Sequence, residues 1–380
     1  MTDATIPFVD LAAQRAFLGS KIDDAIARVL AHGQYILGPE VAGLESQLAG
    51  FTGADHCVTC ANGTDALTLA LMAEGIGPGD AVIVPSFTFV ATAEAVAQLG
   101  ATPVLADVLE DSFNIDPAST SRALDQARRS ELNPRAIIAV DLFGQPADYS
   151  ELGKIAQAES LLLIADAAQS LGARTTTGKV GTLGDYTTTS FFPAKPLGCF
   201  GDGGAIFVED AEKAELLRSL RFHGKGTEKY DNVRIGLNSR LDTLQAAILL
   251  EKLAIFDDEF AARDKVAARY HGRLCNDFAL PRLDNGNTSS WAQYTLRCKD
   301  ETQRDAIRTA CAGAGVPTAV YYPAPLNVQT GYSMFPKDPE GLCVSEKLSQ
   351  TVLSLPMHAY LNQDVQARIC DTVVAALGNR

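Results

Sequence analysis

Four short, almost wholly apolar segments constrain the fold of this chain more than any other feature of its sequence. They occupy residues 82–85, 102–105, 136–140 and 161–165, and glycine, proline or aspartate bounds each of them. Apolar stretches with helical spacing separate them. Strands buried on both faces of a parallel sheet are continuously apolar in this way, whereas half-exposed strands alternate. The pattern predicts an α/β fold in which helices cover both faces of the sheet.

A second structural unit is expected after a long helical stretch, roughly residues 242–265. Beyond it, residues 294–297 are typical of a strand and 302–314 of an amphipathic helix. We therefore divide the chain into a large domain, 1–260, and a small C-terminal domain, 261–380. The segment 1–35 is expected to pack near the small domain. The apolar residues that recur at helical spacing in the connecting stretch are Ala246, Leu249, Leu253, Phe256 and Phe260.

The charge of the chain disfavours two classes of partner. Its 380 residues carry a formal net charge of −14, with acidic residues spread along the chain. Nucleic acids and anionic membranes bind basic surfaces, so neither is an expected partner. No apolar run approaches the roughly 18–20 residues that span a bilayer, and the first residues lack the pattern of a signal peptide. We expect a cytoplasmic protein.

Cysteine chemistry is not expected to carry the function. The chain has eight cysteines, and without a secretory signal they are expected to be reduced thiols. Cys57 and Cys60 form one C-x-x-C pair, which suits half a zinc site or a redox pair, but no second pair completes four ligands. The segment is also typical of a short buried strand, which we favour. Cys199 has no histidine positioned to activate it and is expected to be a small buried hydrophobe. No metal site is predicted.

Two charged residues stand out against apolar surroundings. Asp166 directly follows the buried segment 161–165, at the strand edge where α/β sheets place ligands, although such a residue is also a common helix cap. Lys195 lies among aromatic, proline and glycine residues with no charged neighbour until Asp202. Desolvation there lowers a lysine pKa and supplies the free amine that Schiff-base chemistry requires. The alternative is a surface lysine whose stem packs on apolar residues.

A polar turn at Asn62, Gly63 and Thr64 opens a strongly apolar helix. Free N–H groups and the positive end of the helix dipole suit such a turn to binding phosphate. An N-cap by Asn62 or Thr64 explains the same residues without a ligand. The glycine-rich segment 75–80 precedes a strand rather than a helix, so it is a turn and not a dinucleotide fingerprint.

These motifs occur together, in order, in a family of enzymes. The chain resembles the DegT/DnrJ/StrS sugar aminotransferases, which have the fold of aspartate aminotransferase. The resemblance implies a fold type I transferase dependent on pyridoxal 5′-phosphate (PLP), with a mainly parallel seven-stranded sheet in the large domain and a smaller C-terminal α+β domain. Besides the segments around residues 166 and 195, it rests on residues 7–11, 35–40, 62–64, 85–89, 236–241, 322–326 and 354–358.

The resemblance also implies roles for residues around the PLP ring. Lys195 forms the internal aldimine with PLP and then moves a proton between substrate and cofactor. Asp166 pairs with the pyridinium nitrogen and keeps it protonated. Gln169 contacts the phenolic oxygen, and Phe89 lies against the face of the ring.

The phosphate group has its own expected partners. By the same resemblance, Gly63, Thr64 and Ser190 hold it, joined by Asn238 from a second subunit. A site completed across an interface implies a homodimer.

The segment after the lysine narrows the expected reaction. Relatives with histidine in place of Lys195 catalyse dehydration, so the lysine implies transamination. Residues 195–204, KPLGCFGDGG, follow the pattern of enzymes that aminate C3 of a nucleotide-linked keto sugar. With Pro196 and residues 290–295, the chain is most similar to enzymes that aminate UDP-2-acetamido-2-deoxy-3-oxo-glucuronate for bacterial surface polysaccharide. Glutamate is the amino donor that the family implies.

A uronate substrate requires a cation for its carboxylate, preferably an arginine. Arg240, two residues after Asn238, is our candidate, with an intersubunit salt bridge as the alternative role. Tyr321 and Tyr322 are expected to line the sugar pocket. Relatives often have histidine at the first of these positions, so the contact at Tyr321 is open. His223, on a glycine-rich loop, either approaches the site or is a surface residue.

Two other functions stay open at this point. The first is amination of a dTDP-linked 3-keto-6-deoxy sugar or of a UDP-4-keto sugar. The second is a regulatory protein that binds PLP as a sensor, but no helix-turn-helix segment or basic face supports it.

Overall fold

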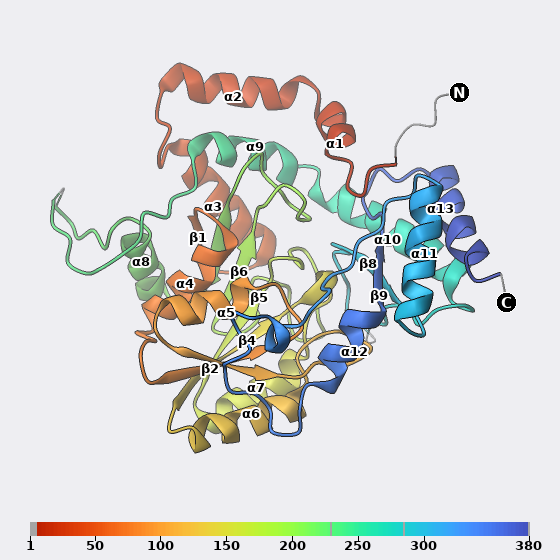
Figure 1. Cartoon of the computed structure of the whole chain (residues 1–380). Coiled ribbons are helices and arrows are strands. Elements are labelled where there is room, and N and C mark those ends of the chain that lie inside the picture. The colour runs from red at the N-terminus through yellow and green to blue at the C-terminus, as the bar shows by residue number, and fades with distance from the viewer. Residues whose placement is uncertain (1–5, 229, 284–285, 379–380) are drawn as a thin grey trace.

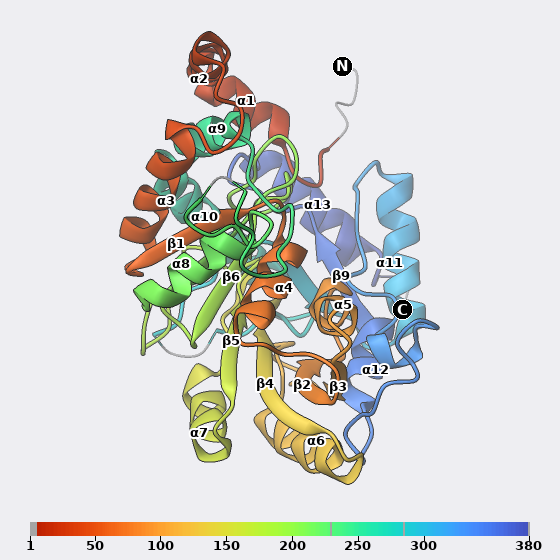
Figure 2. The same ribbon diagram turned by 90° about the vertical axis from the view of Figure 1, so that its left-hand side faces the viewer.

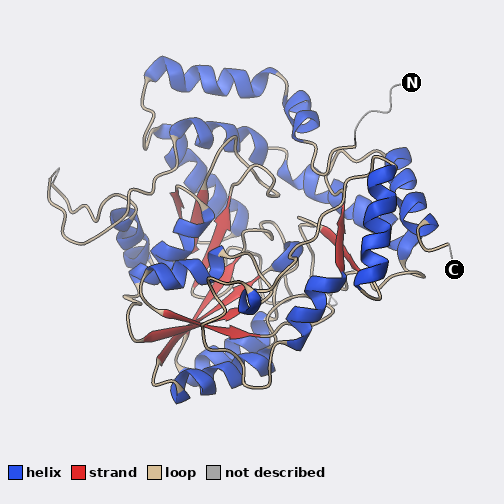
Figure 3. Ribbon diagram, in the orientation of Figure 1, coloured by secondary structure: helices blue, strands red, loops and turns tan. Residues whose placement is uncertain are grey.

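The structure is a computed structural model that describes residues 6–228, 230–283 and 286–378. A seven-stranded sheet covered by helices forms one part, and a two-stranded sheet with helices α11 and α13 forms the other (Figures 1 and 3). Among the described helices, none combines the length and the hydropathy needed to cross a membrane.

The large sheet confirms the predicted mainly parallel architecture. Its strands are ordered β1-β7-β6-β5-β4-β2-β3, and only β7 runs antiparallel to its two neighbours. All four predicted apolar segments are strands of it. The strands are β1 His56–Cys60, β2 Asp80–Pro85, β3 Thr102–Ala106, β4 Asn133–Val140, β5 Leu162–Asp166, β6 Tyr186–Ser190 and β7 Gly204–Val208; the small sheet pairs β8 Tyr294–Arg297 with β9 Val352–Leu355.

Each central strand is buried on both faces, as continuous apolar sequence requires. In β2, Val82 and Val84 pack in the core under α4 and α5, whereas Ala81 and Ile83 pack in the core under α6 and α7. Figure 2 shows α6 and α7 on the side of the sheet opposite α4 and α8. The helices are α1 Leu11–Leu18, α2 Ser20–His32, α3 Pro39–Thr52, α4 Gly63–Ala73, α5 Ala91–Gln98, α6 Pro117–Arg129, α7 Tyr149–Glu159, α8 Ala211–Leu220, α9 Thr243–Leu253, α10 Phe256–Leu274, α11 Glu301–Gly313, α12 Cys343–Thr351 and α13 Gln363–Ala375.

The single long helix expected over 242–265 is in fact two helices. The break falls at Ile255, whose φ of −114° and ψ of 4° lie outside the helical region. The apolar periodicity continues across the break, so the sequence pattern could not reveal it. Helix α10 then joins the two parts of the molecule. Its first residue, Phe256, packs in a large-sheet core, and Tyr270 and Leu274 pack in the core of the small sheet.

The N-terminal segment contacts both parts. Ile6 is buried in the core of the small sheet, and the Phe8 carbonyl accepts a hydrogen bond from the Met357 amide. In α1, Gln14 donates to Glu259 of α10 at 2.9 Å. Helix α2 lies along α9 at the edge of the molecule (Figure 1). The described residues from Ile6 to Gln14 therefore link helix α10 to the core of the small sheet.

Asp107 ties the end of β3 to the start of α12. The residue is 7% exposed, and its carboxylate accepts hydrogen bonds from the Val344 and Ser345 amides at 2.9 and 2.8 Å and from the Ser345 hydroxyl at 2.6 Å. No residue of α12 itself caps the helix by a side chain. A residue more than 230 positions away in the sequence thus satisfies the first amides of this helix.

Replacing Asp107 by alanine leaves these buried amides without an acceptor. We expect Asp107→Ala to lower the free energy of unfolding by about 2–3 kcal/mol, measured as a shift of the urea midpoint. Asp107→Asn, which keeps one acceptor oxygen, is expected to lose less. Asp277, an exposed surface residue, provides the control, because Asp277→Ala is expected to change stability by less than about 0.5 kcal/mol. Equal stabilities for the Asp107→Ala and Asp277→Ala variants would contradict the capping role.

Candidate active site

The carboxylate of Asp166 lies buried at the end of β5, as the sequence predicted. One of its oxygens, Oδ2, accepts a hydrogen bond from the Thr92 hydroxyl at 3.1 Å, and Oδ1 accepts one from the Ala168 amide at 3.2 Å. Burial raises the pKa of Asp166, while these hydrogen bonds and the charge of Lys195 act to lower it. The carboxylate therefore gains stability from any additional positive charge placed next to it.

Lys195 lies on the loop between β6 and β7 and interacts electrostatically with Asp166. Burial lowers the pKa of Lys195, and the Asp166 charge opposes that shift. A lowered pKa increases the fraction of free amine near neutral pH, which is the nucleophilic form. The lysine and the carboxylate, 29 residues apart in the sequence, thus meet at one edge of the sheet.

The turn before α4 packs directly against the end of β6. A Cβ atom on Gly63 would lie 2.7 Å from Cβ of Ser190, so only glycine allows this approach. Asn62 caps the helix by accepting from the Asp65 amide at 2.8 Å, which confirms the capping role considered for it. The amides of Gly63 and Thr64, which begin the helix, have no intrahelical acceptor.

Gln169 and Tyr322 contact each other close to Asp166. The amide oxygen of Gln169 accepts from the Phe143 backbone N–H at 2.6 Å, and its side chain also hydrogen-bonds Tyr322. The ring of Phe89 lies 6.2 Å from that of Tyr322 and is 54% exposed. Tyr321, next in the chain, packs its ring 5.9 Å from Tyr322. The structure therefore groups these four predicted residues, with Phe89 open to solvent.

Asn238 and Arg240 are not grouped with the residues around Lys195. Neither side chain forms a hydrogen bond or ion pair with the described residues there, and the Arg240 guanidinium instead lies 4.8 Å from the ring centroid of Phe222. Asn238 is exposed and pairs with Phe222 as an isolated bridge. That bridge closes the base of the segment 222–238, the arm, whose described residues extend away from the body between α8 and α9 (Figure 1). Within one chain these two residues therefore contact Phe222 and not the residues around Lys195.

His223 lies at the base of the arm with a φ of 59°. Together with Phe222, Lys225 and Asn232 it lines a shallow hollow of about 460 Å³. No described contact joins His223 to the residues around Lys195, so within one chain it belongs to the arm.

Sequence reasoning missed several residues that support the site. Thr92, on α5, is the hydroxyl that meets Asp166. Asp141, directly after β4, accepts from the Ser170 and Tyr149 hydroxyls at 2.5 and 2.7 Å, and burial raises its pKa to about 7. Asp141 directly follows β4, a second buried strand, and this position in the sequence could have identified it as a candidate. Nothing in the sequence marks Thr92.

Cys57, Cys60 and Cys199 are buried in apolar cores, whereas Cys275 and Cys343 are exposed. Cys57 and Cys60 lie in β1, and burial raises the pKa of the Cys60 thiol to about 12. Cys199 is buried, with its pKa raised to about 11. Thiols held in this state are poor nucleophiles and poor ligands at neutral pH, which confirms the prediction for Cys199.

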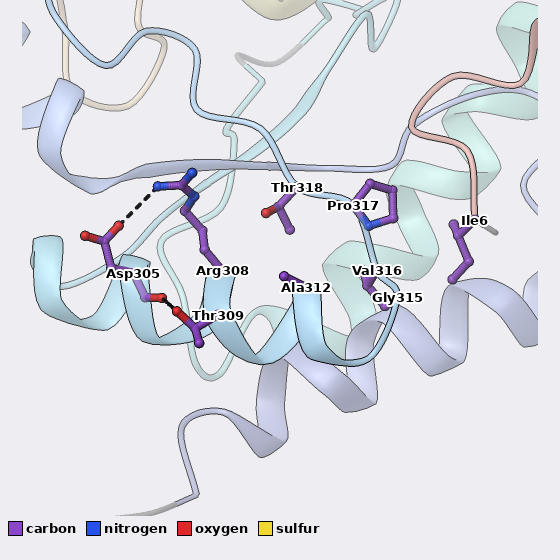
Figure 4. A pocket seen from close by; sticks show the side chains of 9 residues that line it. All are labelled: Ile6, Asp305, Arg308, Thr309, Ala312, Gly315, Val316, Pro317 and Thr318. Carbon is purple, nitrogen blue, oxygen red and sulfur yellow. Dashed lines mark hydrogen bonds and ion pairs between the residues drawn. The ribbon is translucent and has the colours of Figure 1, made fainter.

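A cleft of about 720 Å³ lies beside α11 (Figure 4). It runs between α11 and residues 315–318, with Ile6 at one end, and Arg308 pairs with Asp305 along its side. None of the predicted site residues lines it. Its size alone is therefore no indication of the catalytic centre.

The residues at the sheet edge fit a PLP molecule. Lys195 supplies a partly desolvated amine, and Asp166 supplies a buried carboxylate suited to a protonated ring nitrogen. Ser190 Oγ accepts from the Phe192 amide at 3.2 Å, so its own hydroxyl hydrogen remains for an acceptor such as a phosphate oxygen. The helix N-terminus at Gly63 and Thr64 adds two free amides.

Similarity to known proteins identifies the family of the chain. Residues 17–374 match the DegT/DnrJ/EryC1/StrS aminotransferase family. The chain is 48% identical over 377 residues to the UDP-2-acetamido-2-deoxy-3-oxo-D-glucuronate aminotransferase of Pseudomonas aeruginosa, covering 98% of this chain and 100% of that protein.

Solved structures extend the similarity to the fold and the cofactor. A DegT/DnrJ/EryC1/StrS aminotransferase from Brucella abortus has a TM-score of 0.95 at 50% identity, covering 97% of this chain and 99% of the other. NtdA from Bacillus subtilis, solved with bound PMP, the aminated form of PLP, has a TM-score of 0.89 at 28% identity, covering 100% and 86%. These findings confirm the predicted fold and cofactor. The chain belongs to the DegT/DnrJ/EryC1/StrS family of PLP-dependent aminotransferases.

Proposed function

We propose that this aminotransferase moves an amino group from glutamate to C3 of a nucleotide-linked keto sugar that carries a carboxylate, namely UDP-2-acetamido-2-deoxy-3-oxo-glucuronate. The full-length 48% identity to the P. aeruginosa enzyme of that name carries the proposal. Lysine at position 195 supports transamination, and the basic Arg240 supports an acidic substrate.

Bound PLP supplies an electron sink that stabilises negative charge on the carbon losing its proton. In this proposal Lys195 is the acid–base group. Its amine accepts the proton from Cα of glutamate in the first half of the cycle and delivers a proton to C3 of the sugar in the second. Burial lowers the pKa of Lys195, which favours the free base that the first step needs.

Asp166 is proposed to hold the ring nitrogen in its protonated form. Thr92 and the Ala168 amide orient the carboxylate, and a cationic nitrogen would lower the energy of its buried negative charge. Gln169, which accepts a hydrogen bond from the Phe143 amide, would contact the ring oxygen, and Tyr322, bonded to Gln169, would contact the sugar. Phe89 would cover the ring face and exclude water.

Residues on the arm are proposed to act in a second copy of the chain. Gly63, Thr64 and Ser190 hold the phosphate from one subunit, and Asn238 of the partner subunit completes its binding. Exposed apolar residues support this interface, because Ile235 and Val233 of the arm are 89% and 52% exposed. Arg240 would enter the same neighbouring site and pair with the uronate carboxylate, with Tyr321 lining the sugar pocket.

An amino transfer to a neutral 6-deoxy sugar is the rival within the same class. It needs no cation at Arg240, so in that case the guanidinium only packs on Phe222. Turnover measured by product mass on UDP-uronate and dTDP-6-deoxy ketones, each with glutamate, separates the two, and faster turnover on the neutral sugar would remove the case for the uronate.

Loss of the lysine amine tests the catalytic role. We expect Lys195→Ala to bind PLP without the visible absorbance of the lysine-linked cofactor and to lose at least about 1,000-fold in kcat. Lys154→Ala, at an exposed lysine paired with Glu151, is the control and should keep both properties. Full activity in the Lys195→Ala protein would contradict the assignment.

Removal of the Arg240 charge tests substrate recognition. Arg240→Leu is expected to reduce kcat/KM for the uronate by about 100-fold, corresponding to a charge-assisted pair of ~2–3 kcal/mol. The rate of the first half-reaction with glutamate, followed by absorbance, should change by less than about threefold. A similar loss in both would mean that Arg240 supports the fold or the interface instead of the sugar.

Mixing two inactive variants tests the shared site. A Lys195→Ala subunit and an Asn238→Ala, Arg240→Leu subunit, exchanged in equal amounts, form mixed dimers with one intact site. Random pairing then restores about a quarter of the unsubstituted activity. Recovery should track the dimer peak in size-exclusion chromatography. If subunits exchange and the mixture stays inactive, Asn238 and Arg240 act within their own chain.

A further inference from the structure

The loop that carries Lys195 is folded tightly on itself. The Lys195 amide donates to the Phe192 carbonyl at 2.8 Å, and the Cys199 amide donates to the Phe191 carbonyl at 2.8 Å. A Cβ atom on Gly198 would collide with the Pro193 carbonyl oxygen, so the turn closes only with glycine there. The loop therefore has little freedom within itself, and its placement depends on what holds it from outside.

Helices α9 and α10 hold this loop by three hydrogen bonds. The ammonium of Lys252 donates to the Gly198 carbonyl at 2.6 Å, and the guanidinium of Arg263 donates to the Pro196 carbonyl at 3.3 Å. The Phe200 amide donates to the Gln245 side-chain oxygen at 2.8 Å. These contacts fall on alternate loop residues just after Lys195.

Both cations are buried without a carboxylate in contact. Lys252 is 1% exposed and Arg263 is 8% exposed, and neither forms an ion pair within 4.0 Å among the described residues. Glu259 acts on both only at a distance, because its oxygens accept from Gln14 and from Tyr360. Burial lowers the pKa of Lys252 to about 8.

Such burial is costly for a purely structural contact. An apolar side chain of similar size in place of a buried charge is often neutral or stabilising. The ammonium of Lys252 instead donates a hydrogen bond to the Gly198 carbonyl of the loop. It also lies 4.4 Å from the ring centroid of Phe200, on the same loop. Its contacts are thus directed at the loop.

We propose that Lys252, supported by Arg263 and Gln245, is a positioning residue that sets where the amine of Lys195 acts. The inference rests on the proposed function of Lys195 in moving the proton. An amine displaced by about 1 Å from the reacting carbon can cost about 100-fold in rate. Lys252 contacts the loop at the Gly198 carbonyl and the Phe200 ring, so it would affect the rate through the position of the loop.

The test compares Lys252→Met, which keeps the chain length but removes the donor, with Lys252→Arg, which keeps a charged donor. We expect Lys252→Met holoenzyme to lose about 10–100-fold in kcat while KM for the sugar changes less than about threefold. Visible circular dichroism of bound PLP should change in Lys252→Met and largely return in Lys252→Arg. Lys154→Met, at an exposed position, should change neither quantity.

Three variants together decide whether Lys252 positions the loop. Lys252→Met holoenzyme with kcat within twofold of the unsubstituted protein and the same circular dichroism overturns the proposal. If Lys252→Met does not fold, Gln245→Met makes the same comparison at a less buried position, and full kcat in that variant overturns the proposal.

Lys195→Ala is assayed alongside, to separate failure of the positioning role from failure of the proposed function. If it turns over normally, the proposed function is wrong and the positioning role falls with it, whereas an inactive Lys195→Ala beside a fully active Lys252→Met rejects the positioning role alone.

Discussion

The buried charge interaction between Asp166 and Lys195 is the constraint on which the rest of the site depends. Burial raises the pKa of the carboxyl and lowers that of the amine, so it favours the neutral form of each, while their attraction opposes both shifts. A cofactor that brings a positive ring nitrogen to the carboxylate and takes up the amine relieves this conflict. The polar pair is therefore suited to PLP by its electrostatics, independently of any sequence comparison.

The topology of the sheet brings the proposed phosphate-binding residues to the same edge. Strand β7 returns antiparallel between β1 and β6, which sets Gly204 against Asn62 and Ser190 against Gly63. Glycine is needed at residues 63 and 204 because a Cβ atom would meet Ser190 or the Asn62 backbone. The turn that opens α4 thus lies beside the loop that carries Lys195, and one ligand can reach both.

Much of the fold and of the candidate site could be predicted from the sequence wherever a few adjacent residues determine the structure. The buried strands, the carboxylate after β5 and the turn before α4 each follow from a few adjacent residues. Contacts between distant segments could not be predicted. Thr92 meets Asp166 and Lys252 meets Gly198 only because helices pack onto the sheet. The break at Ile255 was hidden because the apolar periodicity continues across it. The proposed roles of Asn238 and Arg240 rest on the family resemblance, because within one chain neither side chain contacts the described residues around Lys195.

The most direct measurement is the position of the new amine in the product. UDP-2-acetamido-2-deoxy-3-oxo-glucuronate is incubated with ¹⁵N-glutamate and the protein in D₂O, and the sugar is analysed by NMR. We expect ¹⁵N on C3 together with deuterium at the same carbon, because the proton delivered by the Lys195 amine exchanges with solvent. An amine at another carbon, or no ¹⁵N in the sugar with an active protein on a different ketone, would contradict the proposed function.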